Sequence, residues 1–188
     1  DKDERQRVTY NQLGTKSGRF TSASYIQTMP KNDIYGIRRG FIAKPGCKLV
    51  AADFDQQDLR VLAEMSGDAN LQADIKGGVD LHGVVAKGLF DLPCDPCEVK
   101  EQYPAERQNA KAFQYALIYG ATPYSLAQTL DVDADRAANL TARYFEQFPG
   151  IKAFIDDAHG RLQRDGYLDD VFGRRRWFPE VLNTRDHR

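Results

Sequence analysis

The chain has 188 residues, of which 41% are hydrophobic and 28% charged, and its formal net charge is −1 at pH 7. These values describe an ordinary soluble globular protein that is long enough for a real core. The balanced charge provides no general basic field, so binding of nucleic acid would have to use local clusters. No apolar run approaches the roughly 20 residues of a membrane span, and the beginning, DKDERQRV, is not a signal peptide.

The three cysteines exclude a disulfide framework. Two of them, Cys94 and Cys97, form the motif CDPC. A zinc site needs about four ligands, and no second pair occurs in the sequence. Reduced thiols on an intracellular loop are therefore expected, with metal binding as the alternative.

Residues 1–46 are rich in turn-forming Gly, Ser, Thr and Pro and have almost no helical periodicity. The next segment, KLVAADF, predicts a short buried strand over 48–54. It is followed by DQQDLRVLAEMS, in which Leu59, Leu62 and Ser66 line one side of a helix that Gly67 ends.

From about residue 68 to 165 the pattern is nearly all helical. The last segment, GYLDDVFGRRRWFPEV, is β-type, and Gly173 is placed where a hairpin could turn. The pattern predicts an α+β fold that is predominantly α, with a helical subdomain inserted in a small β platform.

One predicted helix, RQNAKAFQYALIYG at 107–120, carries an unusual row. Arg107, Lys111 and Tyr115 are spaced by four and share one face, whereas Ala110, Phe113 and Leu117 have the spacing of a buried stripe. Two interpretations remain open: solvated cations beside half-buried tyrosines, or a binding surface.

Asp53 lies at the end of the predicted buried strand. A carboxylate there could hold a metal ion, but Asp53 or Asp55 could instead cap the following helix. A metal-binding Asp opposite a helix with Arg, Lys and an aromatic ring suits a polyphosphate that carries a planar base.

These residues occur in motifs that resemble family A DNA polymerases, the bacterial DNA polymerase I-like group, from about Val8 to the end of the chain. DFDQQDLRVLAEMSGD is similar to motif A, usually D-Y-S-Q-I-E-L-R, and RQNAKAFQYALIYG to motif B, R-x-x-x-K-x-x-x-[FY]-x-x-x-Y-G. SGRFTSASYIQTMP, IRRGF, DLHGVVAKGLF and GYLDDVFGRRRWFP match further landmarks in the expected order.

The resemblance implies a template-directed DNA polymerase that transfers nucleotides to a primer 3′ end. It places the incoming deoxynucleoside triphosphate among the following residues: Gln56, Asp58, His82, Arg107, Lys111, Tyr115 and Tyr119. Arg107 and Lys111 would hold the phosphates, and Tyr115 would lie by the sugar and base. Primer–template DNA would contact Arg19, Gln27, Arg38, Arg39 and Gly120.

The resemblance also implies two divalent metal ions, expected to be magnesium, in the complete active site. Asp53 would be one of two catalytic carboxylates, the Phe54 carbonyl would be a further ligand, and Lys111 would assist the transfer. The metals would activate the 3′-hydroxyl and stabilise the leaving pyrophosphate.

The same resemblance implies three parts. They are an N-terminal palm portion with motif A (1–66), a helical fingers subdomain with motif B (67–165) and a β-hairpin returning to the palm (166–188). Motif C, His-Asp-Glu, is expected beyond Arg188, because Asp186 and His187 have the wrong order. The chain is therefore expected to need other polymerase segments, including the thumb, and its activity in isolation stays open.

Two positions depart from the usual family pattern. Asp58 replaces the Glu that blocks a ribonucleotide 2′-hydroxyl, and Tyr115 occupies the position where family members have Phe or Tyr. Members with Tyr accept dideoxynucleotides readily.

Two alternatives remain. One is a non-catalytic nucleotide-binding fragment or a subunit of a split polymerase. The other is a palm like that of reverse transcriptases, in which Asp169 and Asp170 of YLDD would bind metal. The expected location is the cytoplasm of a bacterial or phage-infected cell, without membrane contact.

Overall fold

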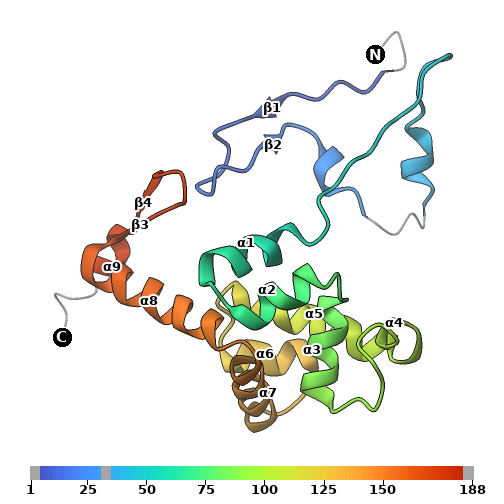
Figure 1. The fold of residues 1–188 in the computed structure, drawn as a ribbon. Helices are drawn as coiled ribbons and strands as arrows, with labels where there is room; N and C mark the ends of the chain where they lie inside the picture. The colour runs from blue at the N-terminus through green and yellow to red at the C-terminus, as the bar shows by residue number, and fades with distance from the viewer. Residues whose placement is uncertain (1–4, 31–34, 184–188) are drawn as a thin grey trace. The chain divides into compact units, whose positions relative to one another are not determined.

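The structure, a computed structural model, describes residues 5–30 and 35–183, so Asp186 and His187 lie outside the described residues. The chain divides into two compact units, Asp1–Asp53 and Phe54–Arg188 (Figure 1). Among the described residues, no helix has both the length and the apolar character needed to span a bilayer.

The first unit consists mainly of turns, as its composition predicts. Strands β1 (Tyr10–Asn11) and β2 (Thr21–Ser22) pair in antiparallel fashion, with Tyr10 opposite Ser22. Two short 3-10 helices follow, η1 (Tyr25–Thr28) and η2 (Ile37–Gly40).

The strand predicted over residues 48–54 is wrong. This segment has no regular secondary structure, and its apolar side chains are exposed, Leu49 by 68% and Val50 by 91%. A strand needs a neighbour to accept and donate its backbone hydrogen bonds. Within the described residues the two sheets pair β1 with β2, and β3 (Tyr167–Asp169) with β4 (Arg175–Trp177), and neither sheet includes this segment.

The second unit contains a group of helices whose positions agree with the helical patterns of the sequence. The helices are α1 (Gln57–Ser66), α2 (Ala69–Lys76), α3 (Leu81–Phe90), α4 (Val99–Gln102), α5 (Pro104–Ile118), α6 (Pro123–Leu130), α7 (Ala134–Gln147) and α8 (Pro149–Asp165). Helix α1 buries Leu59 and Leu62 and ends at Gly67, as predicted.

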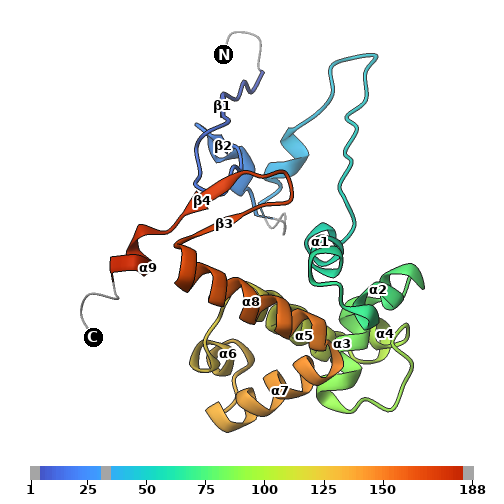
Figure 2. The same cartoon turned by 60° about the vertical axis from the view of Figure 1, so that its left-hand side comes forward.

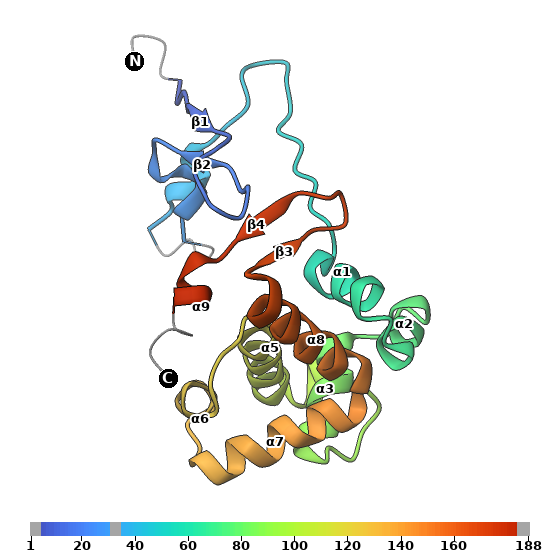
Figure 3. The ribbon, with the colours of Figure 1, turned by 90° about the vertical axis from the view of Figure 1, so that its left-hand side faces the viewer.

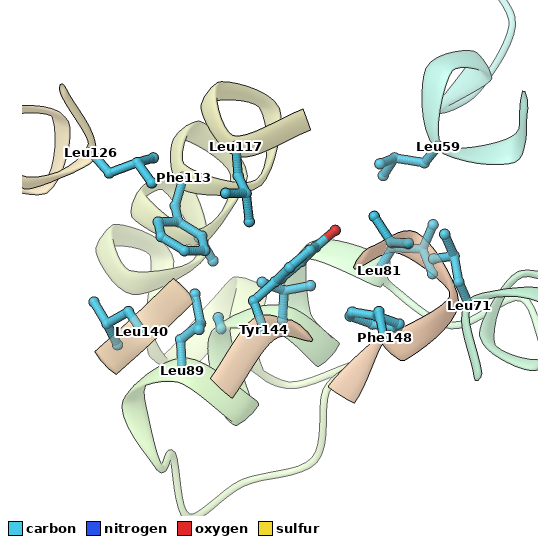
Figure 4. Close-up of a cluster of buried hydrophobic side chains, with 14 of the residues drawn as sticks. Leu59, Leu71, Leu81, Leu89, Phe113, Leu117, Leu126, Leu140, Tyr144 and Phe148 are labelled. Carbon is cyan, nitrogen blue, oxygen red and sulfur yellow. The ribbon is translucent and has the colours of Figure 1, made fainter. Parts of the chain in front are cut away.

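One apolar core joins these helices. Phe113 of α5 meets Tyr144 of α7 edge to face, with ring centroids 6.0 Å apart, and Tyr144 also packs against Phe148. Figure 4 shows Tyr144 among leucines contributed by several helices. Full burial of each large side chain contributes about 1.5–3 kcal/mol to stability, so this cluster orients α3, α5 and α7.

Helix α8 leads into a hairpin of β3 (Tyr167–Asp169) and β4 (Arg175–Trp177), followed by α9 (Pro179–Asn183) (Figures 2 and 3). The turn contains Gly173, as predicted. The fold class is confirmed: the described chain is predominantly helical with two small two-stranded sheets.

Gly83 of α3 allows the loop after that helix to pack closely. A Cβ at Gly83 would lie 2.2 Å from the carbonyl oxygen of Pro96, which is far inside van der Waals contact. Gly160 of α8 differs, because a Cβ there would meet nothing within 4 Å.

We therefore expect the same substitution to have opposite effects at these two glycines. Gly83→Ala should lower the free energy of unfolding by about 2 kcal/mol or more through overpacking. Gly160→Ala should raise it by about 0.5–1 kcal/mol, because Ala favours a helix interior over Gly. Urea unfolding monitored by circular dichroism measures both changes. Shifts of equal sign in the two variants would contradict the close approach at Gly83.

Candidate functional site

Helix α5 has two chemically different faces, as its sequence predicts. Ala110, Phe113 and Leu117 are buried in the core. Arg107, Lys111 and Tyr115 are partly exposed on the other side, and Tyr119 is 65% exposed at the end of the helix. Because the apolar face fixes the helix, the polar row has a defined position on the surface.

Contacts between side chains connect this row to α1 and α3. The Tyr119 hydroxyl donates a hydrogen bond to Asp58 Oδ2 at 2.9 Å. The ring of Tyr115 stacks on that of Tyr119, with centroids 6.4 Å apart, and the centroid of the His82 ring lies 5.9 Å from that of Tyr115. Burial, followed by the charge of Asp58, raises the pKa of Tyr115.

His82 belongs to a buried polar chain between α3, α5 and α7. Its Nδ1 lies 3.1 Å from Gln114 Oε1, and Gln114 Nε2 donates to the Tyr144 hydroxyl at 3.3 Å. Burial lowers the pKa of His82, and the charges of Arg107 and Lys111 lower it further. The hydrogen bond that the ring donates to Gln114 and the charge of Asp80 oppose this shift. A neutral ring with its proton on Nδ1 satisfies the Gln114 oxygen.

Arg107 forms a two-point ion pair with Asp80, the residue that precedes α3. Arg107 Nε donates to Asp80 Oδ2 at 2.6 Å, and Nη2 donates to Oδ1 at 2.9 Å. The side chains are only 24% and 18% exposed. Burial alone would raise the pKa of Asp80, but the hydrogen bonds and charge of Arg107 outweigh it, so this pKa is lowered.

An open cavity of about 380 Å³ adjoins this ion pair. It is lined by residues that precede or belong to α1, α3, α4 and α5, among them Gln56, Arg60, Asp80, Lys100 and Arg107.

Gln56 has two unusual features at this cavity. Its backbone is left-handed, with φ of 51°, and its Oε1 is buried without a hydrogen-bond partner. Strained backbone and unpaired buried polar atoms concentrate at binding sites.

Lys111 and Gly120 complete the motif B residues singled out by the sequence. Lys111 makes no hydrogen bond or ion pair with any residue in the described part of the chain. Gly120 has φ of 83°, a left-handed conformation that favours glycine.

The residues predicted to contact DNA in the first unit have local roles there. Arg38 donates to the carbonyl oxygens of Pro30 and Met29 at 2.8 and 3.0 Å, and Gln27 donates to that of Phe20 at 3.3 Å. Arg19 and Arg39 are exposed. The structure thus places these four residues in one unit, apart in sequence from the motif B helix.

The residues expected to hold metal do not form a complete site. Asp53 and Phe54 are exposed, and no group of three or more His, Cys, Asp or Glu side chains in residues 5–30 and 35–183 could hold an ion. The capping alternative for Asp53 and Asp55 is not observed either, because Gln56 precedes α1 and makes no side-chain capping bond. The three cysteines are free thiols.

Asp169 and Asp170, the residues of the reverse-transcriptase alternative, have structural roles in the hairpin. Arg175 donates to both oxygens of Asp169 at 2.9 and 3.0 Å, and this hydrogen bonding, together with the charge of Arg175, lowers the pKa of Asp169. Asp170 Oδ1 accepts hydrogen bonds from the backbone of Phe172 and Arg174.

Sequence reasoning missed the partners of the predicted residues, namely Asp80, Gln114 and Tyr144. Gln114 had a detectable signal, because it is a polar residue within the apolar stripe of α5. Asp80 had no such signal beyond its place before a helix, since its partner Arg107 is 27 positions away.

Comparison with known proteins assigns the chain a family. The family model for DNA polymerase family A matches residues 1–188. DNA polymerase I of Chloroflexus aurantiacus is 41% identical over 172 residues, which cover 90% of this chain and 18% of that protein. The thermostable DNA polymerase I of Thermus thermophilus is 35% identical over 184 residues, covering 96% of this chain and 21% of that protein. The chain thus spans about a fifth of the length of these relatives.

A solved structure has the same fold. It is the POL domain of Pol1 from M. smegmatis in complex with DNA primer-template and dNTP, with a TM-score of 0.85 and 34% identity. The match covers 96% of this chain and 32% of that one.

The buried position of His82 predicts a dependence of stability on pH. Its pKa in the folded chain lies below the ordinary value of 6.5, so the unfolded chain binds protons more strongly. The free energy of unfolding should therefore fall as the pH is lowered below 6.5. Urea unfolding at a series of pH values measures the slope, which His82→Gln should reduce. His159→Gln, at an exposed position of α8, is the matched control; an unchanged slope in His82→Gln would contradict the assignment.

Proposed function

Because the chain belongs to DNA polymerase family A, we propose that it forms the part of a DNA polymerase that binds the incoming deoxynucleoside triphosphate. The observation that carries the proposal is the convergence of predicted nucleotide contacts within the second unit. Tyr119, at the end of α5, bonds to Asp58 of α1 and stacks on Tyr115. Tyr115 in turn adjoins His82 of α3. Gln56 and Arg107 line one cavity. The reaction is nucleotidyl transfer to a primer 3′ end.

The phosphates are assigned to the cationic end of this surface. Lys111 has no ion-pair partner within the described chain, so its ammonium group can bind phosphate oxygens without losing another contact. Arg107, one turn earlier on α5, supplies a second cation. Gln56 and His82 help to seat the nucleotide, and the unpaired Gln56 Oε1 would gain a donor from it or from water.

The sugar and base are assigned to the aromatic end. Tyr115 would lie beside the deoxyribose, and Tyr119 with Gly120 would lie at the templating position. The hydrogen bond from Tyr119 places Asp58 against this row, where its carboxylate can exclude a 2′-hydroxyl.

The remaining assignments concern DNA, metal and other segments. Arg19, Gln27, Arg38 and Arg39 would contact primer–template DNA, in which phosphate contacts provide affinity without reading sequence. Asp53 would contribute one carboxylate, and Phe54 its carbonyl, to a magnesium centre whose other ligands, including those of motif C, come from outside this chain. We assign residues 1–66 and 166–188 to the palm, residues 67–165 to the fingers, and the enzyme to the bacterial cytoplasm.

Removal of the Lys111 charge tests the phosphate assignment. In the full polymerase that contains this chain, Lys111→Ala should reduce nucleotide incorporation by roughly tenfold to a hundredfold, the value of a charge-assisted contact of about 1.5–3 kcal/mol. Single-turnover primer extension with magnesium gives the rate, and fluorescence anisotropy gives the affinity for duplex DNA, which should hardly change. Lys76→Ala, at an exposed position of α2, is the control. Loss of duplex affinity with intact nucleotide affinity would instead identify α5 as a DNA-contact helix.

The Tyr115 hydroxyl tests the sugar assignment. A nucleotide without its 3′-hydroxyl leaves a polar gap, and an unpaired buried polar group is unfavourable by about 1–3 kcal/mol. The Tyr hydroxyl can provide a hydrogen bond there, whereas Phe cannot. Tyr115→Phe should therefore make the polymerase discriminate against dideoxynucleotides with little effect on normal synthesis. The efficiencies of deoxynucleotide and dideoxynucleotide incorporation are measured for the parent, for Tyr115→Phe and for the control Tyr124→Phe in α6. If the ratio of the two efficiencies is the same in both variants, Tyr115 has only a packing role.

A further inference from the structure

The Arg107 side chain occupies an electrostatically unfavourable position. It projects from the first turn of α5, where the unpaired backbone N–H groups of a helix create a partial positive charge. A partly buried guanidinium there needs a counter-charge. Asp80 supplies it, and the mutual effect is visible in the raised pKa of Arg107, for which the Asp80 hydrogen bond is the main cause.

The geometry of the pair uses only part of the guanidinium. Asp80 accepts from Nε and Nη2, which form one edge of the planar group. Nη1 has no partner among residues of the described chain, so its N–H groups remain available. A two-point contact also fixes the plane of the guanidinium, which a single hydrogen bond would leave free to rotate.

Arg107 lines a cavity that also contains a buried hydrogen-bond acceptor without a partner. Arg107 and Asp80 line the same cavity as Gln56, whose Oε1 is buried without a partner. Lys100 also lines this cavity and adds positive charge, whereas Arg60 is occupied by hydrogen bonding to the Asp55 carbonyl at 2.8 Å.

We infer that Asp80 is a positioning residue for nucleotide binding: it holds Arg107 with Nη1 directed to the triphosphate and remains bonded to it when the nucleotide binds. This inference rests on the proposed function, because it requires that Arg107 bind phosphate. Asp80 itself contacts no nucleotide atom. It lowers the entropy that Arg107 loses on binding, since the guanidinium is already oriented.

The opposite arrangement would be competition, in which Arg107 must leave Asp80 before it can reach the phosphates. The two arrangements predict opposite changes in nucleotide affinity when Asp80 is neutralised. If Asp80 positions Arg107, its neutralisation weakens nucleotide binding; if Asp80 competes with the phosphates, its neutralisation strengthens binding.

The experiment uses the full polymerase that contains this chain, bound to a primer–template with a dideoxy-terminated primer. The dissociation constant of the correctly paired deoxynucleoside triphosphate is measured for the parent, Asp80→Asn, Arg107→Ala and the double variant. Asp80→Asn should weaken binding by about tenfold, with unchanged affinity for duplex DNA. The double variant should bind no more weakly than Arg107→Ala alone, because Asp80 acts through Arg107.

The matched control is Asp91→Asn. Asp91 lies at the other end of α3, forms a similar two-point ion pair with Arg143 and does not line the cavity. Asp91→Asn should leave nucleotide affinity unchanged. Thermal stability can change in both Asp80→Asn and Asp91→Asn.

The other outcomes separate the role of Asp80 from the proposed binding of nucleotide. Unchanged or tighter binding in Asp80→Asn, while Arg107→Ala weakens binding, would overturn the role of Asp80 and leave the proposed function intact. Unchanged binding in Arg107→Ala would overturn both. Should Asp80→Asn fail to fold, Asp80→Glu supplies the same test, since its longer side chain displaces the guanidinium and should weaken binding only when Arg107 is present.

Discussion

The burial of one face of α5 against α3, α6 and α7 is the constraint on which the candidate site depends. Phe113 and Leu117 are held in the core, and the edge-to-face contact of Phe113 with Tyr144 fixes the rotation of α5 about its axis. Rotation by one residue, about 100°, would place Arg107 or Lys111 in the apolar core. The surface row is therefore positioned by the residues opposite to it.

The buried chain of His82, Gln114 and Tyr144 adds specificity to this packing. Apolar contacts tolerate small shifts of one helix along another, whereas hydrogen bonds between buried groups do not. Gln114 is fully buried, so its amide must keep its partners on both sides. The same chain connects the core to the site, because the His82 ring that bonds to Gln114 also adjoins Tyr115.

Charge in the second unit is organised by pairing, both at the site and away from it, although the chain as a whole is nearly neutral. Arg107 is compensated by Asp80, and Arg143 by Asp91. Lys111 is different, because it has no such partner within the described residues. A polyanionic ligand can therefore find local positive charge on a protein that would not attract anions at long range.

The elements that depend on local interactions could be predicted from the sequence, and those that depend on a distant partner could not. The helices, the two faces of α5 and the turn at Gly173 follow from periodicity and from residues that are neighbours in the chain. The apolar run at 48–54 was misleading, because a strand exists only with a hydrogen-bonded neighbour. Within the described chain, no strand pairs with this segment. The ion pair of Asp80 with Arg107 and the bond of His82 to Gln114 bridge 27 and 32 positions. Such contacts exist only once packing has set the distance and angle between two helices, which no local pattern encodes.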